Sequence, residues 1–281
     1  MGPDHPPGVQ IESAHSAHPF NERVNMKTRQ ITFTGALGTK LAARLDEPDA
    51  AARAMAIFAH CFTCTKDLPA IRRIATALTD HGFAVLRFDF SGLGQSEGDF
   101  AASSFSSNVG DLLCAANWLS ENAQAPSLLL GHSLGGAAVL AAAGKIDSVK
   151  AVATIGAPSE PQHIAAMFTE VADEIQRSGK ADVEIAGRTF EISRQFMDDI
   201  GRYALLPQIA KLHRALLIFH SPLDTVVSIE HAAAIFQAAK HPKSFVSLDR
   251  ANHMLTDKAD AEFVAEVLAA WAVRYAANPA P

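Results

Sequence analysis

Short apolar segments alternate with longer amphipathic segments from about residue 28 to near the end of the chain. A short apolar segment bounded by turn residues predicts a buried strand, whereas apolar residues that recur every three or four positions predict a helix on a sheet. Regular alternation of the two is typical of an α/β fold, a mostly parallel sheet with helices on both faces. Eight strands are expected, and the first two form an antiparallel pair around a glycine turn. The strands are expected at residues 30–34, 40–45, 55–59, 84–89, 127–131, 151–155, 215–219 and 244–248.

Helical spacing of apolar residues is clear in three of the connecting segments. These residues are Leu68, Ile71, Ile74, Ala75 and Leu78 in the first segment, Val109, Leu112, Leu113 and Ala116 in the second, and Phe263, Val267, Trp271 and Tyr275 in the last. We expect the last four to form one buried stripe that belongs to the core and not to a cofactor site.

The segment between the strands that end at residue 155 and begin at residue 215 is longer than one crossover helix requires. It predicts a small inserted cap at about residues 159–206. Ser159 and Gln162 have the spacing of a capping box, and Gly179 is placed to end the helix that follows. A small hairpin with strands at 183–185 and 189–192 and a second helical piece should complete the cap.

The pentapeptide 131–135, GHSLG, lies between an apolar strand and a helix-forming stretch. This context predicts a nucleophile elbow, a sharp turn that projects the hydroxyl of Ser133 into a cleft. A side chain at Gly131 or Gly135 would collide with the neighbouring strand or helix as the backbone reverses. The alternative is a helix that begins after a glycine turn with Ser133 as its N-cap.

A serine nucleophile requires a general base and an acid that orients the base. Asp224 follows the strand at 215–219, and His253 ends a short polar loop after the strand at 244–248. Alone, an aspartate there is usually a turn former and a histidine there is usually solvated. In the order Ser133, Asp224, His253, each after the carboxyl end of a strand, they predict a catalytic triad.

The oxyanion that forms during serine attack requires hydrogen-bond donors. The loop HCFTC at residues 60–64 follows an apolar strand, in the place where such a fold keeps one donor. The backbone N–H groups of Phe62 and of Leu134, the residue after the nucleophile, are the predicted pair.

The blocks 60–67, 88–98 and 131–136 resemble those of the α/β-hydrolases over about residues 27–276. The block 88–96, FDFSGLGQS, is similar to that of hydrolases of the serine aminopeptidase and esterase type. The sequences HCFTC at 60–64 and SSNV at 106–109 resemble the corresponding sequences in the hydrolase half of bacterial proteins that join this domain to an OsmC-like domain. The resemblance implies an α/β-hydrolase domain at 27–281 that hydrolyses carboxylic esters, and many relatives have glycine where this chain has Cys61.

The expected reaction is a two-step acyl transfer from an ester, with a preference for short acyl chains. The cap is expected to lie across the mouth of the site, where apolar side chains could line an acyl pocket or only pack the cap onto the sheet. The candidate pocket residues are Cys61, His132, Met167, Phe168, Phe196 and Met197. Thioesterase, amidase and peptidase activities use the same intermediate and stay open, as does a hydrolase-like protein that binds without catalysis.

The pair Cys61 and Cys64 also has the C-x-x-C spacing of a redox dithiol or of half a zinc site. The third cysteine, Cys114, falls within a helical pattern, so we expect both members of the pair to be small packing residues. The glycines at 92, 94 and 98 do not fit a dinucleotide loop, because Glu97 stands where the third glycine would be. Asp89 is expected to be a structural loop carboxylate.

The composition agrees with a single large domain, with 281 residues of which 48% are hydrophobic. The net charge of −6 argues against nucleic acid as a partner. Three cysteines favour a reducing compartment. Residues 1–26 lack the pattern of a signal peptide and are expected to be a disordered tail, and the longest apolar run, 134–143, is too short to cross a bilayer. We expect a cytoplasmic enzyme, monomeric or homodimeric, that acts on a small-molecule ester without a cofactor, metal or membrane.

Overall fold

The computed structural model describes residues 26–185 and 187–277, so the predicted tail lies almost entirely outside the described residues. Its main sheet has eight strands in the order β1-β2-β4-β3-β5-β6-β9-β10. Strand β2 pairs antiparallel with β1 and β4, and the other adjacent strands pair in parallel. The strands are β1 Lys27–Thr34, β2 Lys40–Glu47, β3 Ala54–Ala59, β4 Phe83–Phe88, β5 Leu128–His132, β6 Ala151–Ile155, β9 Ala215–His220 and β10 Lys243–Ser247. All eight predicted strands are confirmed, with ends that differ by a few residues.

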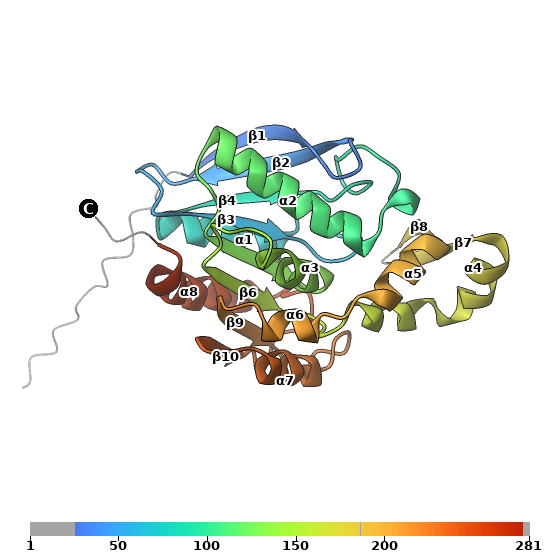
Figure 1. The fold of residues 1–281 in the computed structure, drawn as a ribbon. Helices are drawn as coiled ribbons and strands as arrows, with labels where there is room; N and C mark the ends of the chain where they lie inside the picture. The colour runs from blue at the N-terminus through green and yellow to red at the C-terminus, as the bar shows by residue number, and fades with distance from the viewer. Residues whose placement is uncertain (1–25, 186, 278–281) are drawn as a thin grey trace, which may run out of the picture.

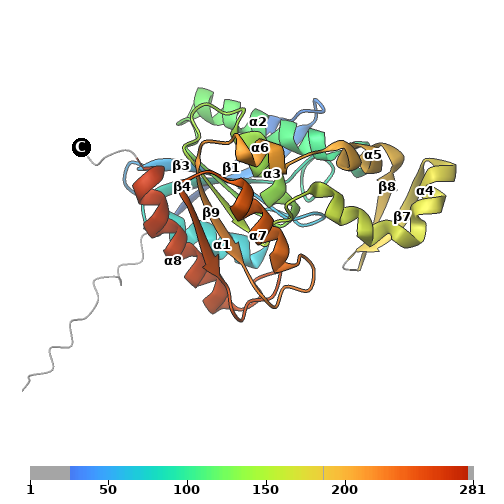
Figure 2. The ribbon, with the colours of Figure 1, turned by 60° about the horizontal axis from the view of Figure 1, so that its bottom comes forward.

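Helices cover both faces of this sheet, as Figures 1 and 2 show. Helices α1 (Pro69–Asp80) and α8 (Lys258–Tyr275) pack against each other on one face. The other face carries α2 Phe105–Asn122, α3 Leu134–Ala143, α6 Leu206–Ala210 and α7 Ile229–Ala238. Two hydrophobic clusters, one on each face, form the core, and the five central strands are buried on both sides. The α/β fold predicted from the apolar pattern is confirmed.

The buried face of α8 differs from the predicted stripe. Phe263 is 47% exposed, and Val267, Trp271 and Tyr275 are only partly buried. The side chains that α8 buries are instead Ala261, Val264, Ala265, Leu268, Ala269 and Ala272. Small alanine side chains let α8 lie close to the sheet and to α1, so the large residues remain at the edge of the contact.

The cap is inserted between β6 and β9 and projects from one end of the sheet (Figure 1). It consists of the 3₁₀ segment η2 Pro161–Val171, the helix α4 Ala172–Ser178, the hairpin of β7 Lys180–Ile185 and β8 Arg188–Ser193, and the helix α5 Arg194–Arg202. Gly179 ends α4 in the left-handed conformation, with φ 85°, as predicted.

The predicted capping box at the start of the cap is wrong. The hydroxyl of Ser159 lies 2.9 Å from Nδ1 of His231, and the amide of Gln162 donates to the carbonyl of Tyr203 at 2.7 Å. Both side chains therefore bond across to other elements instead of to the first turn. The carboxylate of Glu160 similarly accepts hydrogen bonds from the backbone N–H groups of Leu205 and Leu206, where the chain returns from the cap.

Candidate active site

The turn between β5 and α3 places Ser133 in a strained conformation. Its φ of 55° and ψ of −127° lie in a region that side-chain-bearing residues rarely adopt. A Cβ atom at Gly131 would lie 2.6 Å from the Cα atom of Gly136, and one at Gly135 would lie 2.6 Å from the carbonyl oxygen of Ala59. The predicted steric need for glycine at both positions is confirmed, because these neighbours are backbone atoms that cannot rotate away.

The alternative interpretation of Ser133 as a helix N-cap holds for its position but not for its side chain. The residue does occupy the N-cap position of α3, but its side chain makes no capping hydrogen bond. The hydroxyl oxygen lies 3.0 Å from Nε2 of His253 instead. The backbone N–H of Ser133 donates to the carbonyl of Ile155 at 2.9 Å, which ties the turn to the end of β6.

The side chains of Asp224 and His253 come together with Ser133 from two further loops. Asp224 follows β9, and its Oδ2 lies 2.7 Å from Nδ1 of His253. Its Oδ1 accepts hydrogen bonds of 2.9 Å from the backbone N–H groups of Val226 and Val227. With the proton on Nδ1 facing the carboxylate, Nε2 of His253 is free to accept the proton of the Ser133 hydroxyl.

The environment keeps Asp224 ionised. Its side chain is 2% exposed, and burial alone would raise its pKa. Hydrogen bonds from His253 and from the backbone N–H groups outweigh burial, so the pKa of Asp224 lies below its usual value. The carboxylate can therefore stabilise the positive charge that His253 acquires when it accepts a proton.

His132 supports the loop of His253 and does not line a substrate surface, so its prediction as a pocket residue is wrong. It is 3% exposed, and its Nε2–H donates to the carbonyl oxygen of His253 at 2.6 Å. Burial, together with the nearby His253, lowers the pKa of His132 to about 4. The ring is thus neutral near pH 7 and acts as a fixed hydrogen-bond donor.

The side chain of His60 fixes the loop after β3 through hydrogen bonds to backbone groups. Nδ1–H of His60 donates to the carbonyl oxygen of Cys61 at 2.8 Å, and its Nε2 accepts from the backbone N–H of Phe90 at 3.2 Å. Burial lowers the pKa of His60, which keeps the ring neutral, with one donor and one acceptor. This role of His60 was not predicted, because its only signal in the sequence is a histidine directly after a buried strand.

Phe62 and Leu134, the predicted oxyanion donors, line the same small cavity beside Ser133's turn. Leu134 is the first residue of α3, where a backbone N–H has no acceptor within the helix. Asp89 anchors the neighbouring loop: its carboxylate accepts from the backbone N–H of Lys66 at 2.6 Å and pairs with the Lys66 ammonium at 2.7 Å. Asp89 is fully buried in this pair, in agreement with a structural role.

Cys61 and Cys64, expected to be small packing residues, are joined by a disulfide that was not predicted, and Cys61 is buried. The backbone turn 61–64 brings their Cα atoms to 5.3 Å, which a spacing in sequence cannot reveal. Cys114 is a free, half-buried cysteine. Among the described residues, no group of three or more His, Cys, Asp or Glu side chains could hold a metal ion.

The candidate pocket residues of the cap differ in how deeply they are buried. Phe168 and Phe196 are buried, and their ring centroids lie 6.1 and 5.4 Å from that of Phe62. Met197 is partly buried against the hydrophobic cluster that includes Phe168 and Phe196, whereas Met167 is 50% exposed. The two phenylalanines thus join the cap to the loop after β3, and Met167 lies at the surface.

An eight-stranded, mostly parallel sheet with a serine at a strained strand-to-helix turn and an inserted cap defines an α/β-hydrolase. The family model described as serine aminopeptidase, S33, matches residues 51–195, and the chain belongs to this family of hydrolases.

Relatives of known structure are esterases and other α/β-hydrolases. The esterase domain of a Rhodothermus marinus protein is 50% identical, with a TM-score of 0.74 over 89% of this chain and 99% of that one. Rat mitochondrial palmitoyl-protein thioesterase ABHD10 is 26% identical over 191 residues, 64% of this chain and 62% of the relative's length. The chain thus spans less than two thirds of the curated relatives that it matches. The structure of mouse α/β-hydrolase domain-containing protein 10, 20% identical with a TM-score of 0.73 over 88% and 99% of the two chains, has the same fold.

Within the described ranges, no helix has both the length and the apolar character needed to cross a membrane.

Proposed function

We propose that this α/β-hydrolase is a serine esterase that cleaves carboxylic esters through an acyl-enzyme intermediate. The observation that carries the proposal is the continuous hydrogen-bonded path from Ser133 through His253 to Asp224, with distances of 3.0 and 2.7 Å. His253 removes the hydroxyl proton as Ser133 attacks the ester carbonyl, and then gives it to the departing alcohol. A water activated by the same imidazole releases the acid.

The backbone N–H groups of Phe62 and Leu134 are the proposed oxyanion donors. Both residues border the cavity at the elbow, and Leu134 lies at the positive end of the α3 dipole. Loss of one such donor costs about 10²–10³-fold in kcat in serine hydrolases, so the pair would supply a large part of the rate enhancement.

Esters with short acyl chains are the proposed substrates. The phenylalanine rings of the cap, Phe168 and Phe196, are buried against Phe62, so they fill space that a long acyl chain would need. A series of p-nitrophenyl esters from acetate to palmitate tests this preference. The highest kcat/KM is expected for acetate or butyrate, and a maximum at palmitate would contradict it.

Thioester hydrolysis is the second candidate, favoured by the 26% identity to rat ABHD10, which is named a palmitoyl-protein thioesterase. An ester and a thioester with the same acyl group form the same acyl-enzyme, so their kcat/KM ratio reports the leaving-group preference alone. A ratio that strongly favours the thioester would replace esterase with thioesterase as the main activity.

A fluorophosphonate probe followed by peptide mass mapping tests the nucleophile. We expect the label on Ser133, and Ser133→Ala should remove both the label and at least about 10³-fold of the turnover of p-nitrophenyl acetate. Ser120→Ala, at an exposed serine on α2, is the matched control and should behave as the wild type. Labelling at another residue, or an active Ser133→Ala variant, would contradict the proposal, and absence of label and turnover would favour a non-catalytic binding protein.

A further inference from the structure

The turn 61–64 holds one residue in a conformation that it does not favour. Thr63 has φ 61°, and positive φ is uncommon and strained for a β-branched residue. Two links close the turn around Thr63: the backbone N–H of Cys64 donates to the carbonyl of Cys61 at 3.2 Å, and the disulfide joins the two side chains. The covalent link therefore opposes the relaxation of Thr63 to negative φ.

The same links set the direction of the proposed oxyanion donor. The carbonyl of Cys61 and the N–H of Phe62 belong to one peptide unit, and in a planar trans peptide these two groups point in opposite directions. The carbonyl is held by His60 Nδ1–H at 2.8 Å and by the N–H of Cys64. The disulfide, which keeps Cys64 beside Cys61, thus also helps to fix the orientation of the peptide that carries the N–H of Phe62.

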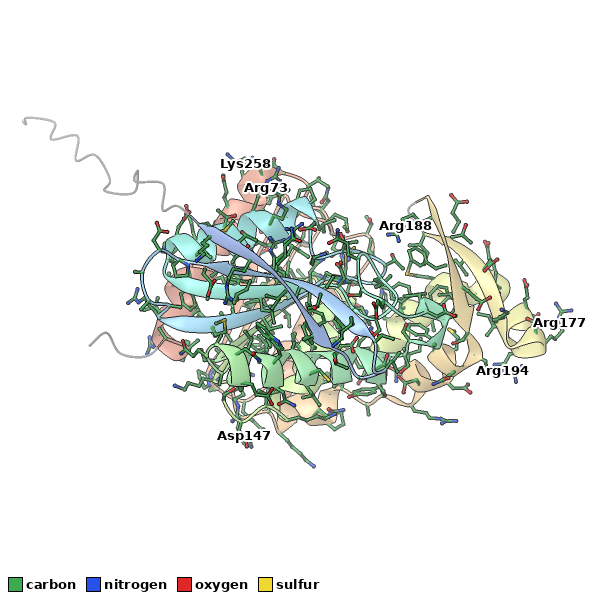
Figure 3. The ribbon with its side chains drawn as sticks, turned by 90° about the horizontal axis from the view of Figure 1, so that it is seen from above. Arg73, Asp147, Arg177, Arg188, Arg194 and Lys258 are labelled. Carbon is green, nitrogen blue, oxygen red and sulfur yellow. A yellow bond between two sulfur atoms is a disulfide. The ribbon has the colours of Figure 1, made fainter. Side chains whose placement is uncertain are left out.

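The turn also supports the cap. The guanidinium of Arg188 donates to the carbonyl of Thr63 at 3.4 Å, and the ring of Phe62 contacts Phe168 and Phe196. Figure 3 shows Arg188 where the cap hairpin faces the main body, whereas Arg177 and Arg194 lie at the far end of the cap. Release of the turn would therefore loosen the cap as well as the oxyanion donor.

We propose that the Cys61–Cys64 disulfide is a redox-controlled positioning element, which keeps the enzyme active when intact and lowers its turnover when reduced. This inference rests on the proposed function, because it assigns the donor role to Phe62. Cys61 is 4% exposed and Cys64 is half-buried, so the sulfur that a reductant reaches more easily is that of Cys64.

The redox step is a thiol–disulfide exchange with a dithiol reductant. A thiolate of the reductant attacks Sγ of Cys64, the Cys61–Cys64 bond breaks, and Cys61 leaves as a thiolate that takes up a proton. The second thiolate of the reductant then attacks the reductant's other sulfur atom, which is bonded to Sγ of Cys64 in the mixed disulfide. This step closes the reductant's disulfide and releases Cys64 as a thiolate, which takes up a proton. Two electrons pass to the protein, and the reductant leaves as its disulfide.

The test compares the full chain before and after reduction with dithiothreitol, with the thiol state checked by alkylation and mass spectrometry. We expect reduction to lower kcat for p-nitrophenyl acetate and the rate of fluorophosphonate labelling at Ser133 by about tenfold or more, with little change in KM. Reoxidation should restore both. A Cys61→Ser, Cys64→Ser double variant should be slow at any potential, and Cys114→Ser should respond as the wild type does.

Equal kcat and equal labelling rates in the two redox states would overturn the inference and leave the proposed function intact. Lack of labelling at Ser133 in both states would overturn the proposed function and the inference together. Circular dichroism and thermal unfolding are measured on the same samples. A reduced protein that is unfolded at the assay temperature would contradict a local positioning role, whereas a folded but slow protein supports it.

Discussion

A single added methyl group at Gly135 should be enough to disable the site. Gly135 is the second residue of α3, and a Cβ atom there would lie 2.6 Å from the carbonyl oxygen of Ala59 and closer still to that of His60. Ordinary contacts of a Cβ atom begin at 3.4 Å, so α3 or the end of β3 must move by roughly 1 Å in Gly135→Ala.

The size of the effect follows from what these two elements carry. The end of β3 leads into the peptide of Phe62 and α3 begins with Leu134, so a shift of either element would separate the two proposed oxyanion donors. Overpacking of this kind costs about 1–3 kcal/mol of stability. A misplacement of about 1 Å can cost about 10²-fold in rate. We therefore expect kcat to fall about 100-fold in Gly135→Ala, with a smaller change in KM.

Gly144→Ala is the matched control, because it adds the same methyl group at the other end of α3. Gly144 has φ −72° and no atom within 4 Å of the added Cβ, so this variant should be unchanged or more stable by about 0.4–1 kcal/mol. Steady-state kinetics on p-nitrophenyl acetate and urea unfolding check both variants. A Gly135→Ala enzyme that is as active and as stable as Gly144→Ala would refute the steric reasoning.

Two further substitutions test the groups around His253. Asp224→Asn removes the carboxylate that sets the tautomer of His253, and kcat on the same ester should fall by about 10⁴-fold while the fold persists; near-normal activity would exclude an orienting role. His132→Gln keeps an N–H donor but no longer titrates. The pKa of His132 is about 4 in the folded chain, whereas the ordinary value is 6.5. As the pH falls below 6.5, the unfolded chain therefore binds a proton that the folded chain does not, and the free energy of unfolding decreases until about pH 4. The loss of unfolding free energy between pH 7 and pH 5 should therefore be smaller by roughly 2 kcal/mol in His132→Gln, measured by urea unfolding at both pH values. An identical loss in both proteins would show that His132 does not remain neutral.

The fold and the strained turn at Ser133 could be predicted because each leaves a local pattern. Strands buried on both faces appear as continuous apolar segments, and the elbow requires glycine on both sides of Ser133 for steric reasons that hold in any such turn. The buried face of α8 could not be predicted in the same way. Its large side chains, such as Phe263, form a regular stripe, but close packing against the sheet selects the alanine-rich side instead.

The positioning residues escaped prediction because their role depends on contacts between distant segments. The bond from His132 to the carbonyl of His253 joins residues 121 positions apart, and neither residue type indicates it. The disulfide depends on a turn with positive φ at Thr63, for which the sequence offers no glycine as a signal. Likewise, Ser159 has capping-box spacing but lies close enough to His231 to bond there.

The three groups of the proposed triad share a mode of support that bears on how the site would work. Ser133 is fixed by a backbone bond to Ile155 and by the steric limits of its turn, and Asp224 is fixed by two backbone N–H groups. The loop of His253 is fixed at its carbonyl by His132. The bonds at Ser133 and His253 involve only backbone groups of these two residues, so the hydroxyl and the imidazole stay free to exchange a proton. Because the polar groups are already oriented before substrate arrives, little reorganisation is needed as charge develops, which is the condition under which fixed dipoles lower a barrier most.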